Sequence, residues 1–457
     1  MSAEQQYIDL YEANGQLVCG HSTDIMNAVR RSAFDDFVRQ GFPTRKNERY
    51  KYTDLSKLFE YNYGIDLGRR MDAAVVSGFN PYEVFKCDVP DMHTSTFFVA
   101  NDKLCHNKGT EDVDSLASQG VIVDSLTAAA VRYPDIISRC YGKLADTSAD
   151  GITAFNTAFA QDGVFIYVPQ GVVVDRPLQL INILKSSVDL LVNRRVLIVV
   201  EPHAQLRLLA CDHTSDNARF LSTQVIEAYV GEGASFDFYE LEENSTATVR
   251  ISNLYLDQQA SSNVLLNGMT LNNGTTRNMT RVSLSGEGAE LKLYGMAVAD
   301  RYQRVDNNTF VDHRVPHCTS DQLYKYVLDG NAVGAFAGLV KVEPGAHHTH
   351  SEQANRNLCA TREAHMYTQP QLEIYNDDVR CNHGAAVGQL DESALFYMQQ
   401  RGIPLKEARL LLMFAFVGEI ADAIRIDALK ERLHYLIEKR FRGELNSGCR
   451  GCEICKR

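Results

Sequence analysis

The chain has 457 residues, 45% of them hydrophobic and 23% charged, which is typical of a globular protein with a sizeable core. Its 46 Lys and Arg residues against 58 Asp and Glu residues give a formal net charge of -12, so we expect no nucleic-acid partner. No run of about 18 apolar residues could cross a membrane, and the N-terminus lacks the pattern of a secretion signal, so the 11 cysteines indicate reduced thiols and a cytoplasmic protein.

The first part of the chain predicts helices. Residues 21–40 predict an amphipathic helix with Thr23 as its N-cap and Gly41-Phe42-Pro43 after its end. Its apolar residues recur at helical spacing at Met26, Val29, Ala33 and Phe37. The run 44–54 is dense in charge and tyrosine, and a solvated loop clamped by ion pairs explains it better than a surface that faces a partner. Residues 111–150 predict a mixed, partly helical segment.

Short strands are expected from about Phe155 onward. The runs Val164–Val168, Leu178–Ile183 and Val196–Val200 are rich in β-branched or aromatic residues and lie between turn residues. No helical pattern separates these runs. This part of the chain therefore predicts successive strands without intervening helices.

A repeat accompanies these strands. The motif Glu201-Pro-His-Ala204 returns as Gly231-Glu-Gly-Ala234 and Gly286-Glu-Gly-Ala289, each time before an alternating strand. Weaker copies are Ala260-Ser-Ser and Glu343-Pro-Gly-Ala346, and the last gap between alanines spans two periods of about 28 residues. Strands at a fixed period predict a β-solenoid whose units stack to bury one continuous core. A β-sandwich is the alternative, but it predicts no fixed period.

A Cys-x-His pair follows the repeat. Cys381 and His383 lie between a short predicted strand, Gln371–Tyr375, and a helix that Asp391 can cap. A thiolate and an imidazole suit a transition metal or an iron–sulfur cluster, but two residues cannot complete a coordination shell. Ligands from elsewhere would have to complete such a site. The structural alternative is a buried cysteine beside a turn histidine that bonds the backbone.

Helical patterns return after residue 388. The helix that begins at Asp391 is expected to bury Leu395 and Phe396 and to end near Gly402. The run Leu405–Ile420 is apolar around most of its circumference and predicts a helix buried in a bundle or an interface. Residues 427–441 predict an amphipathic helix. Its apolar face comprises Leu429, Leu433, Leu436 and Ile437.

Two further groups have metal-ligand spacing. Cys449, Cys452 and Cys455 lie in a polar C-terminal tail at a spacing that suits zinc or an iron–sulfur cluster, although a fourth ligand is missing. The second group could form a cupin-like iron site, but solvated side chains on the outer face of a strand are the expected reading. It consists of His347, His348, His350 and Glu352.

The chain resembles SufD-type members of the SufB/SufD family, which belong to the SufBCD scaffold complex for iron–sulfur cluster assembly. The most specific match is Cys381-Asn-His383-Gly384 followed by Gly388-Gln-Leu-Asp391, which is similar to SufD and not to SufB. The resemblance spans most of the chain. Its other matching segments are Gly41–Glu48, Lys51–Thr53, Asp312-His313, Pro316–Cys318, Tyr324-Lys325, Gly338 and Gln353–Leu358.

This resemblance implies a right-handed parallel β-helix flanked by helical regions. The expected division is a mainly helical N-terminal region at 1–110, a β-helix core at 111–380, a helical C-terminal region at 381–446 and a flexible cysteine-bearing tail at 447–457. The resemblance also implies a scaffold that pairs with a SufB-like subunit and docks a SufC-like ATPase on its C-terminal helices. In that pairing His383 would help to hold a nascent, shared iron–sulfur cluster, with Cys381 as a supporting residue.

The sequence leaves several alternatives open. No GxxxxGK[ST] phosphate loop occurs, so the ATPase activity is expected in a separate subunit and this chain is expected to be an assembly protein, not an enzyme. A metal-dependent, cupin-like oxygenase would use the histidines at 347–350. A β-helix carbohydrate-active enzyme would need clustered carboxylates on one sheet face, and the repeats show no such ladder. A homodimer in place of the heterodimer also stays open.

Overall fold

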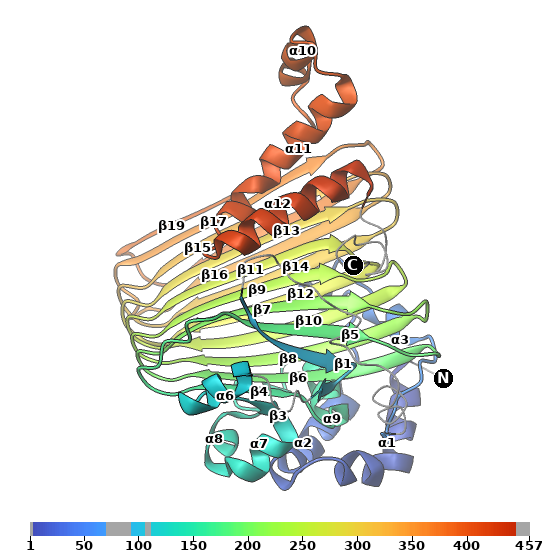
Figure 1. Cartoon of the computed structure of the whole chain (residues 1–457), viewed down its shortest axis with the longest axis vertical. Helices are drawn as coiled ribbons and strands as arrows, with labels where there is room; N and C mark the ends of the chain where they lie inside the picture. The colour runs from blue at the N-terminus through green and yellow to red at the C-terminus, as the bar shows by residue number, and fades with distance from the viewer. Residues whose placement is uncertain (1–2, 70–92, 106–110, 445–457) are drawn as a thin grey trace.

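The computed structural model describes residues 3–69, 93–105 and 111–444, and its centre is a parallel β-solenoid, as the repeat predicts (Figure 1). From Val164 onward, successive strands alternate between two sheets that face each other. In the described part of the chain one sheet has ten strands and the other has nine.

The ten-stranded sheet is parallel throughout except for its last pair. In spatial order it contains β19 (Val379–Gly388), β17 (Thr349–Cys359), β15 (Thr319–Leu328), β13 (Glu290–Ala299), β11 (Asn263–Asn272), β9 (Ser235–Glu243), β7 (Gln205–Thr214), β5 (Leu178–Leu184), β1 (Ser95–Ala100) and β2 (Lys103–Cys105).

The nine-stranded sheet has the same organisation, with one antiparallel pair at the same end. It contains β18 (His365–Ile374), β16 (Val333–Val342), β14 (Arg304–His313), β12 (Thr275–Leu284), β10 (Thr248–Gln258), β8 (Phe220–Val230), β6 (Leu190–Val200), β4 (Val164–Val168) and β3 (Ile122–Ser125).

The helices lie before, between and after these strands. They are α1 (Ala3–Gly20), α2 (Asp24–Gln40), the 3-10 helix η1 (Glu48–Tyr50), α3 (Leu55–Phe59), α6 (Glu111–Ser118), α7 (Leu126–Arg132), α8 (Pro134–Cys140), α9 (Gly151–Phe159), α10 (Glu392–Gln400), α11 (Leu405–Asp422) and α12 (Asp427–Arg442). In the described part of the chain no helix is both long and apolar enough to cross a lipid bilayer.

The repeated motif forms the turns between the sheets. Ala204, Ala234 and Ala289 are buried immediately before β7, β9 and β13. The weak copy at Ala260 does not align with the others. Asn263 of β11 pairs with Ser235 of β9, so Ser262, not Ala260, occupies the position equivalent to Ala234. The gap between Ala289 and Ala346, which spans two periods, contains one further copy, in which Cys318 precedes β15. The copy at Ala346 is also out of register, because His350 pairs with Thr319 and Thr349 therefore takes the equivalent place. The period follows the stacked rungs, but Ala260 and Ala346 are misassigned.

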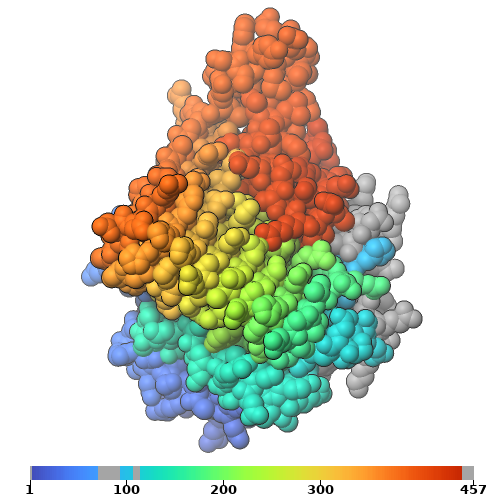
Figure 2. All heavy atoms as spheres, turned by 90° about the vertical axis from the view of Figure 1, so that its left-hand side faces the viewer, coloured from blue at the N-terminus to red at the C-terminus, as the bar shows by residue number. Residues whose placement is uncertain are grey.

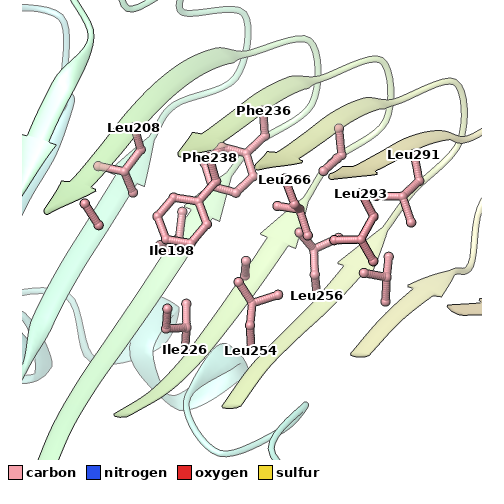
Figure 3. Close-up of a cluster of buried hydrophobic side chains, with 14 of the residues drawn as sticks. Ile198, Leu208, Ile226, Phe236, Phe238, Leu254, Leu256, Leu266, Leu291 and Leu293 are labelled. Atoms are coloured by element: carbon pink, nitrogen blue, oxygen red, sulfur yellow. The ribbon is translucent and has the colours of Figure 1, made fainter. Parts of the chain in front are cut away.

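Alternate side chains of both sheets fill the interior. Figure 3 shows this core, in which Ile198 and Leu254 of one sheet point toward Leu208 and Leu266 of the other. Because strand residues alternate between faces, each strand supplies its other side chains to the outer face. The interior is thus a continuous apolar column that runs from rung to rung.

Helices cover both outer faces. The N-terminal helices pack on the outer face of the nine-stranded sheet, where Leu191, Leu221 and Ile251 join their core. Helices α11 and α12 pack on the outer face of the ten-stranded sheet. In Figure 2 the colours form bands in chain order from the N-terminal helices to the projecting C-terminal helices, as expected for stacked rungs.

The helix predictions are confirmed in position, and two details differ. Thr23 occupies the N-cap of α2, but its side chain makes no capping hydrogen bond. Asp391 caps α10 by accepting from the backbone N–H groups of Ser393 and Ala394. The prediction that Phe396 is buried is wrong, because this side chain is 63% exposed whereas Leu395 is buried. The predicted apolar face of α12 is buried as expected.

The segment 44–54 is more than a solvated loop. The Tyr50 ring is fully buried, and its hydroxyl donates to Asp150. The guanidinium of Arg277 lies 3.8 Å from the centre of that ring and donates to the carbonyl of Arg49. Some of the expected ion pairs exist at the surface, as between Arg45 and Asp54. The segment is therefore anchored to the solenoid by buried contacts.

Candidate functional site at the open end of the solenoid

The solenoid ends with β18 and β19. In the described part of the chain β19 pairs only with β17, and β18 pairs only with β16. The chain leaves the ladder after Gly388, where the Asp391 cap starts α10. Both final strands therefore present an unpaired edge of backbone N–H and C=O groups.

Cys381 and His383 lie within β19, in register with Ser351 and Gln353 of β17. The sequence indicated a junction between a strand and a helix, but the strand continues through both residues because their backbone completes the parallel ladder with β17. Side chains alternate between faces along a strand. Cys381 packs against the interior core, so His383, two residues later, shares its inward face. His383 is exposed because, among the residues that the structure describes, no further rung covers it.

Two columns of inward-facing side chains in the ten-stranded sheet change from apolar to polar over the last rungs. Parallel pairing in register places equivalent side chains one above another. One column passes through Leu291, Ser320, Ser351 and Cys381. The neighbouring column passes through Leu293, Gln322, Gln353 and His383. The Cys-x-His pair therefore lies at the end of two columns of buried polar side chains.

A hydrogen bond connects the two serines of the first column, and another joins this pair to His313. Nε2 of His313, from the opposite sheet, lies 2.9 Å from Oγ of Ser320, and that oxygen lies 2.8 Å from Oγ of Ser351. Burial lowers the pKa of His313 to about 3, so its imidazole is neutral. The column leads to Cys381, whose thiol has a pKa raised by burial. A thiol with a raised pKa is a weak ligand until a metal or a cation displaces its proton.

The second column is held by amides. Oγ1 of Thr309 donates to Oε1 of Gln322 over 2.9 Å, and Nε2 of Gln353 donates to the same oxygen over 3.4 Å. Gln322 and Gln353 are almost completely buried. The sequence indicated neither glutamine as part of this site, because Gln322 lies four residues after Cys318 but Gln353 lies seven after Ala346. Only the register between β15 and β17 aligns the two side chains.

The histidines at 347, 348 and 350, at the start of β17, are separate from this site. His348 lies in a left-handed turn, stacks on His317 with ring centres 4.6 Å apart and has Nδ1 3.1 Å from Asp378. His350, on the outer face of β17, lies 3.6 Å from Glu352. Nδ1 of His347 lies 3.2 Å from the amide nitrogen of Asn376. Across the described ranges, no group of three metal-ligating side chains is assembled.

The predicted tail ligands Cys449, Cys452 and Cys455 lie outside the described residues.

A second surface of interest is formed by α10 and the first half of α11, which project beyond the sheets in Figure 1. Several large apolar side chains are exposed there, with Phe396 at 63% and Tyr397 at 59%. Leu405 and Leu411 on α11 are exposed as well. An apolar surface of this kind is typical of a protein–protein contact.

Comparison with known families agrees with these features. The family model described as "SUF system FeS cluster assembly, SufBD core domain" matches residues 183–416, and the "SufBD protein N-terminal region" matches residues 1–180. The iron–sulfur cluster assembly protein SufD of Escherichia coli is 25% identical over 452 residues, which cover 97% of either chain.

Two other relatives give the same picture. An iron–sulfur cluster assembly SufBD family protein of Synechocystis is 25% identical over 434 residues, which cover 93% of each chain. The SufD protein of Bacillus subtilis is 27% identical over 340 residues, which cover 72% of this chain and 75% of the relative.

Proposed function

This chain belongs to the SufBD family of the SUF system for iron–sulfur cluster assembly, and on that premise we propose that it is a SufD-type scaffold subunit. It would pair with a SufB-like subunit, dock a SufC-like ATPase and work in the cytoplasm. Its task would be assembly of a cluster, which is its cargo, rather than catalytic turnover. The observation that carries this proposal is the polar, open end of the solenoid, where Cys381 and His383 lie on the inward face of β19.

The unpaired edges support pairing with a subunit of the same architecture. A strand from the partner can add to β18 or β19 and satisfy the exposed backbone groups, as in β-augmentation. The partner's last rung would then cover the inward-facing residues of β19. His383 would thereby come to lie at a subunit interface. A second copy of this chain could occupy the same edges when the SufB-like subunit is absent.

The chemistry of the two side chains assigns them different roles. The imidazole of His383 is exposed and offers a nitrogen ligand to iron without losing a proton from a neutral ring. Cys381 is half-buried, and its raised pKa keeps the thiol protonated. His383 would thus hold the nascent cluster together with a ligand of the partner, and Cys381 would support it.

The projecting helices support the docking of an ATPase. Phe396 and Tyr397 on α10 are exposed beyond the solenoid and away from its packed faces. A SufC-like subunit that covers these side chains and then changes its arrangement on ATP hydrolysis could shift the position of the open end. The tail thiols Cys449, Cys452 and Cys455 would bind iron transiently.

Anaerobic co-purification of the tagged chain with SufB-like and SufC-like partners tests this function. We expect the wild type to recover both partners and to hold iron and sulfide after reconstitution. His383→Ala should keep the partners and lose the cluster. The matched control is His350→Ala, which removes an exposed histidine from the outer face of the adjacent strand β17 and should keep both.

Two results would contradict the proposal. A wild-type chain that never recovers these partners would exclude the scaffold role. His383→Ala complexes with wild-type iron and sulfide content would exclude the assigned site. Replacement of all three tail cysteines by serine should lower iron uptake by the isolated chain without changing partner recovery, and unchanged uptake would remove the tail from the proposal.

A further inference from the structure

The residue in register with His383 on the preceding rung is Gln353. Its side chain points into the solenoid, is 3% exposed and crosses toward the opposite sheet. It lies against Gly338 of β16, where an added Cβ would come within 2.4 Å of Nε2 of Gln353. The missing side chain at Gly338 is therefore what leaves room for the amide of Gln353.

The hydrogen bonds of Gln353 give its amide a direction. Nε2 donates to Oε1 of Gln322, which also accepts from Thr309. Oε1 of Gln353 is buried and has no hydrogen-bond partner among the residues that the structure describes. An amide whose nitrogen is engaged on the rung below retains its oxygen as the acceptor for a neighbouring donor. A buried acceptor of this kind is satisfied in almost all proteins.

We propose that Gln353 is the positioning residue of His383 and accepts one ring N–H of its imidazole. This inference rests on the proposed function. A neutral imidazole has one N–H and one lone pair, so a fixed acceptor for the N–H also fixes which nitrogen keeps the lone pair. The chain of hydrogen bonds from Thr309 through Gln322 to Gln353 thereby directs the lone pair of His383 toward the open end, where the partner and the cluster would bind. Hydrogen-bond acceptors that bind the non-ligating N–H of a metal-binding histidine orient its ring in this way.

The tautomer of His383 is the direct test. The chain is prepared with ring-15N histidine, and the His383 signals are assigned by their loss in His383→Ala. In spectra recorded at increasing pH until the ring shifts no longer change, we expect the two ring nitrogens of wild-type His383 to give the separate shifts of a single tautomer. Gln353→Met removes the acceptor and should give averaged shifts. Gln353→Glu keeps an acceptor oxygen and should restore the single tautomer.

Two glycine variants provide a matched pair. Gly338→Ala should move Gln353 aside and change the His383 signals as Gln353→Met does. Gly334→Ala on the same strand places its Cβ 2.6 Å from Sδ of Met366 and 2.9 Å from Leu328, so it disturbs apolar neighbours and should leave the His383 signals unchanged. The apolar isostere at 353 is tolerable because Leu293 occupies the same column two rungs earlier.

A cluster measurement separates the two proposals. In the reconstituted complex, Gln353→Met should lower iron binding about 10- to 100-fold while the partners are retained. The positioning role is overturned if the His383 shifts are the same in wild type and Gln353→Met, whatever the cluster content. If those shifts differ as expected but His383→Ala keeps its cluster, the positioning stands and the proposed role of His383 in holding the cluster fails.

Discussion

The ring of Tyr52 stacks on the ring of Tyr367, with centroids 4.9 Å apart and planes 18° from parallel. Tyr52 belongs to the N-terminal segment, and Tyr367 belongs to β18 at the open end of the solenoid. The Tyr52 hydroxyl donates to Gln369, 317 residues later in the chain, and Glu48 accepts from the same glutamine amide. The segment 44–54 therefore ties the N-terminal helices to the last rung.

Removing this stack should loosen the last rung locally. Tyr52→Ala loses an aromatic pair that contributes about 0.5–1.5 kcal/mol beyond burial, so we expect faster amide hydrogen exchange in 48–53 and in β18. Tyr52→Phe keeps the stack and loses only the hydroxyl bond, and it should stay close to wild type. Exchange in β6 and β8 should not change in either variant. Equal exchange in Tyr52→Ala and wild type would show that the stack carries no stability.

The attachment of α11 should depend on Lys325. Its ammonium, almost fully buried on β15, donates to the carbonyl of Phe416 over 2.8 Å and lies 2.5 Å from Glu419. Lys325→Met removes a charged hydrogen bond that joins β15 to α11 and should cost about 1.5–3 kcal/mol. Denaturant unfolding measures the loss, and hydrogen exchange should place it in α11. Lys292→Met, which changes an exposed lysine on the adjacent strand β13, is the control. Equal losses in both variants would contradict the assignment.

Close stacking of the turns predicts an unequal response of two glycines. A Cβ on Gly286 would lie 1.8 Å from the backbone nitrogen of Ala260 on the neighbouring turn. Since backbone on both sides must move, Gly286→Ala should destabilise the chain by about 3 kcal/mol. Gly345 has nothing within 4 Å of an added Cβ, so Gly345→Ala should stay within about 0.5 kcal/mol of wild type. Thermal or denaturant unfolding compares them, and similar values would refute the close approach.

Acid sensitivity should depend on His313. Its folded pKa of about 3 lies below the ordinary value of 6.5, so the unfolded chain binds a proton in this window that the folded chain does not. This contribution to stability is complete above pH 6.5 and is lost as pH falls toward 3, with a slope of up to about 1.4 kcal/mol per pH unit. His313→Gln removes the titrating group. Urea unfolding between pH about 7 and 4.5 should then show a shallower decline, and identical slopes would contradict the prediction.

The fold could be predicted because each rung repeats the same short turn motif, which can be recognised in the sequence. Small residues recur where each rung enters the ten-stranded sheet, and they are buried there, as at Ala234 and Ala289. The weak copy at Ala260 was misassigned because rungs differ in length. The register steps by 27 residues from Asn263 to Glu290 but by 31 from Thr319 to His350. Residue spacing therefore indicates that rungs stack without giving which residues align.

Helix faces were predictable to the extent that packing is one-sided. The amphipathic pattern of α12 gave its buried face, because a single contact with the sheet decides which side chains leave water. The prediction that Phe396 is buried was wrong because α10 projects beyond the sheets, and no described part of the chain covers this side chain, whereas Leu395 on the same helix is buried. The prediction of a solvated loop at 44–54 missed the burial of Tyr50, because that burial depends on Asp150 and Arg277 from distant parts of the chain.

The sequence by itself determined a β-solenoid with flanking helices, and it determined that Cys381 and His383 share one face if they lie in a strand. These properties follow from local alternation and from a repeated turn. Only the tertiary structure decided that this strand is the last one, that its inward face is uncovered and that Gln353 lies beneath His383. Those facts depend on where pairing stops and on the register between rungs, and register is set by the lengths of turns whose effect appears only when the rungs stack.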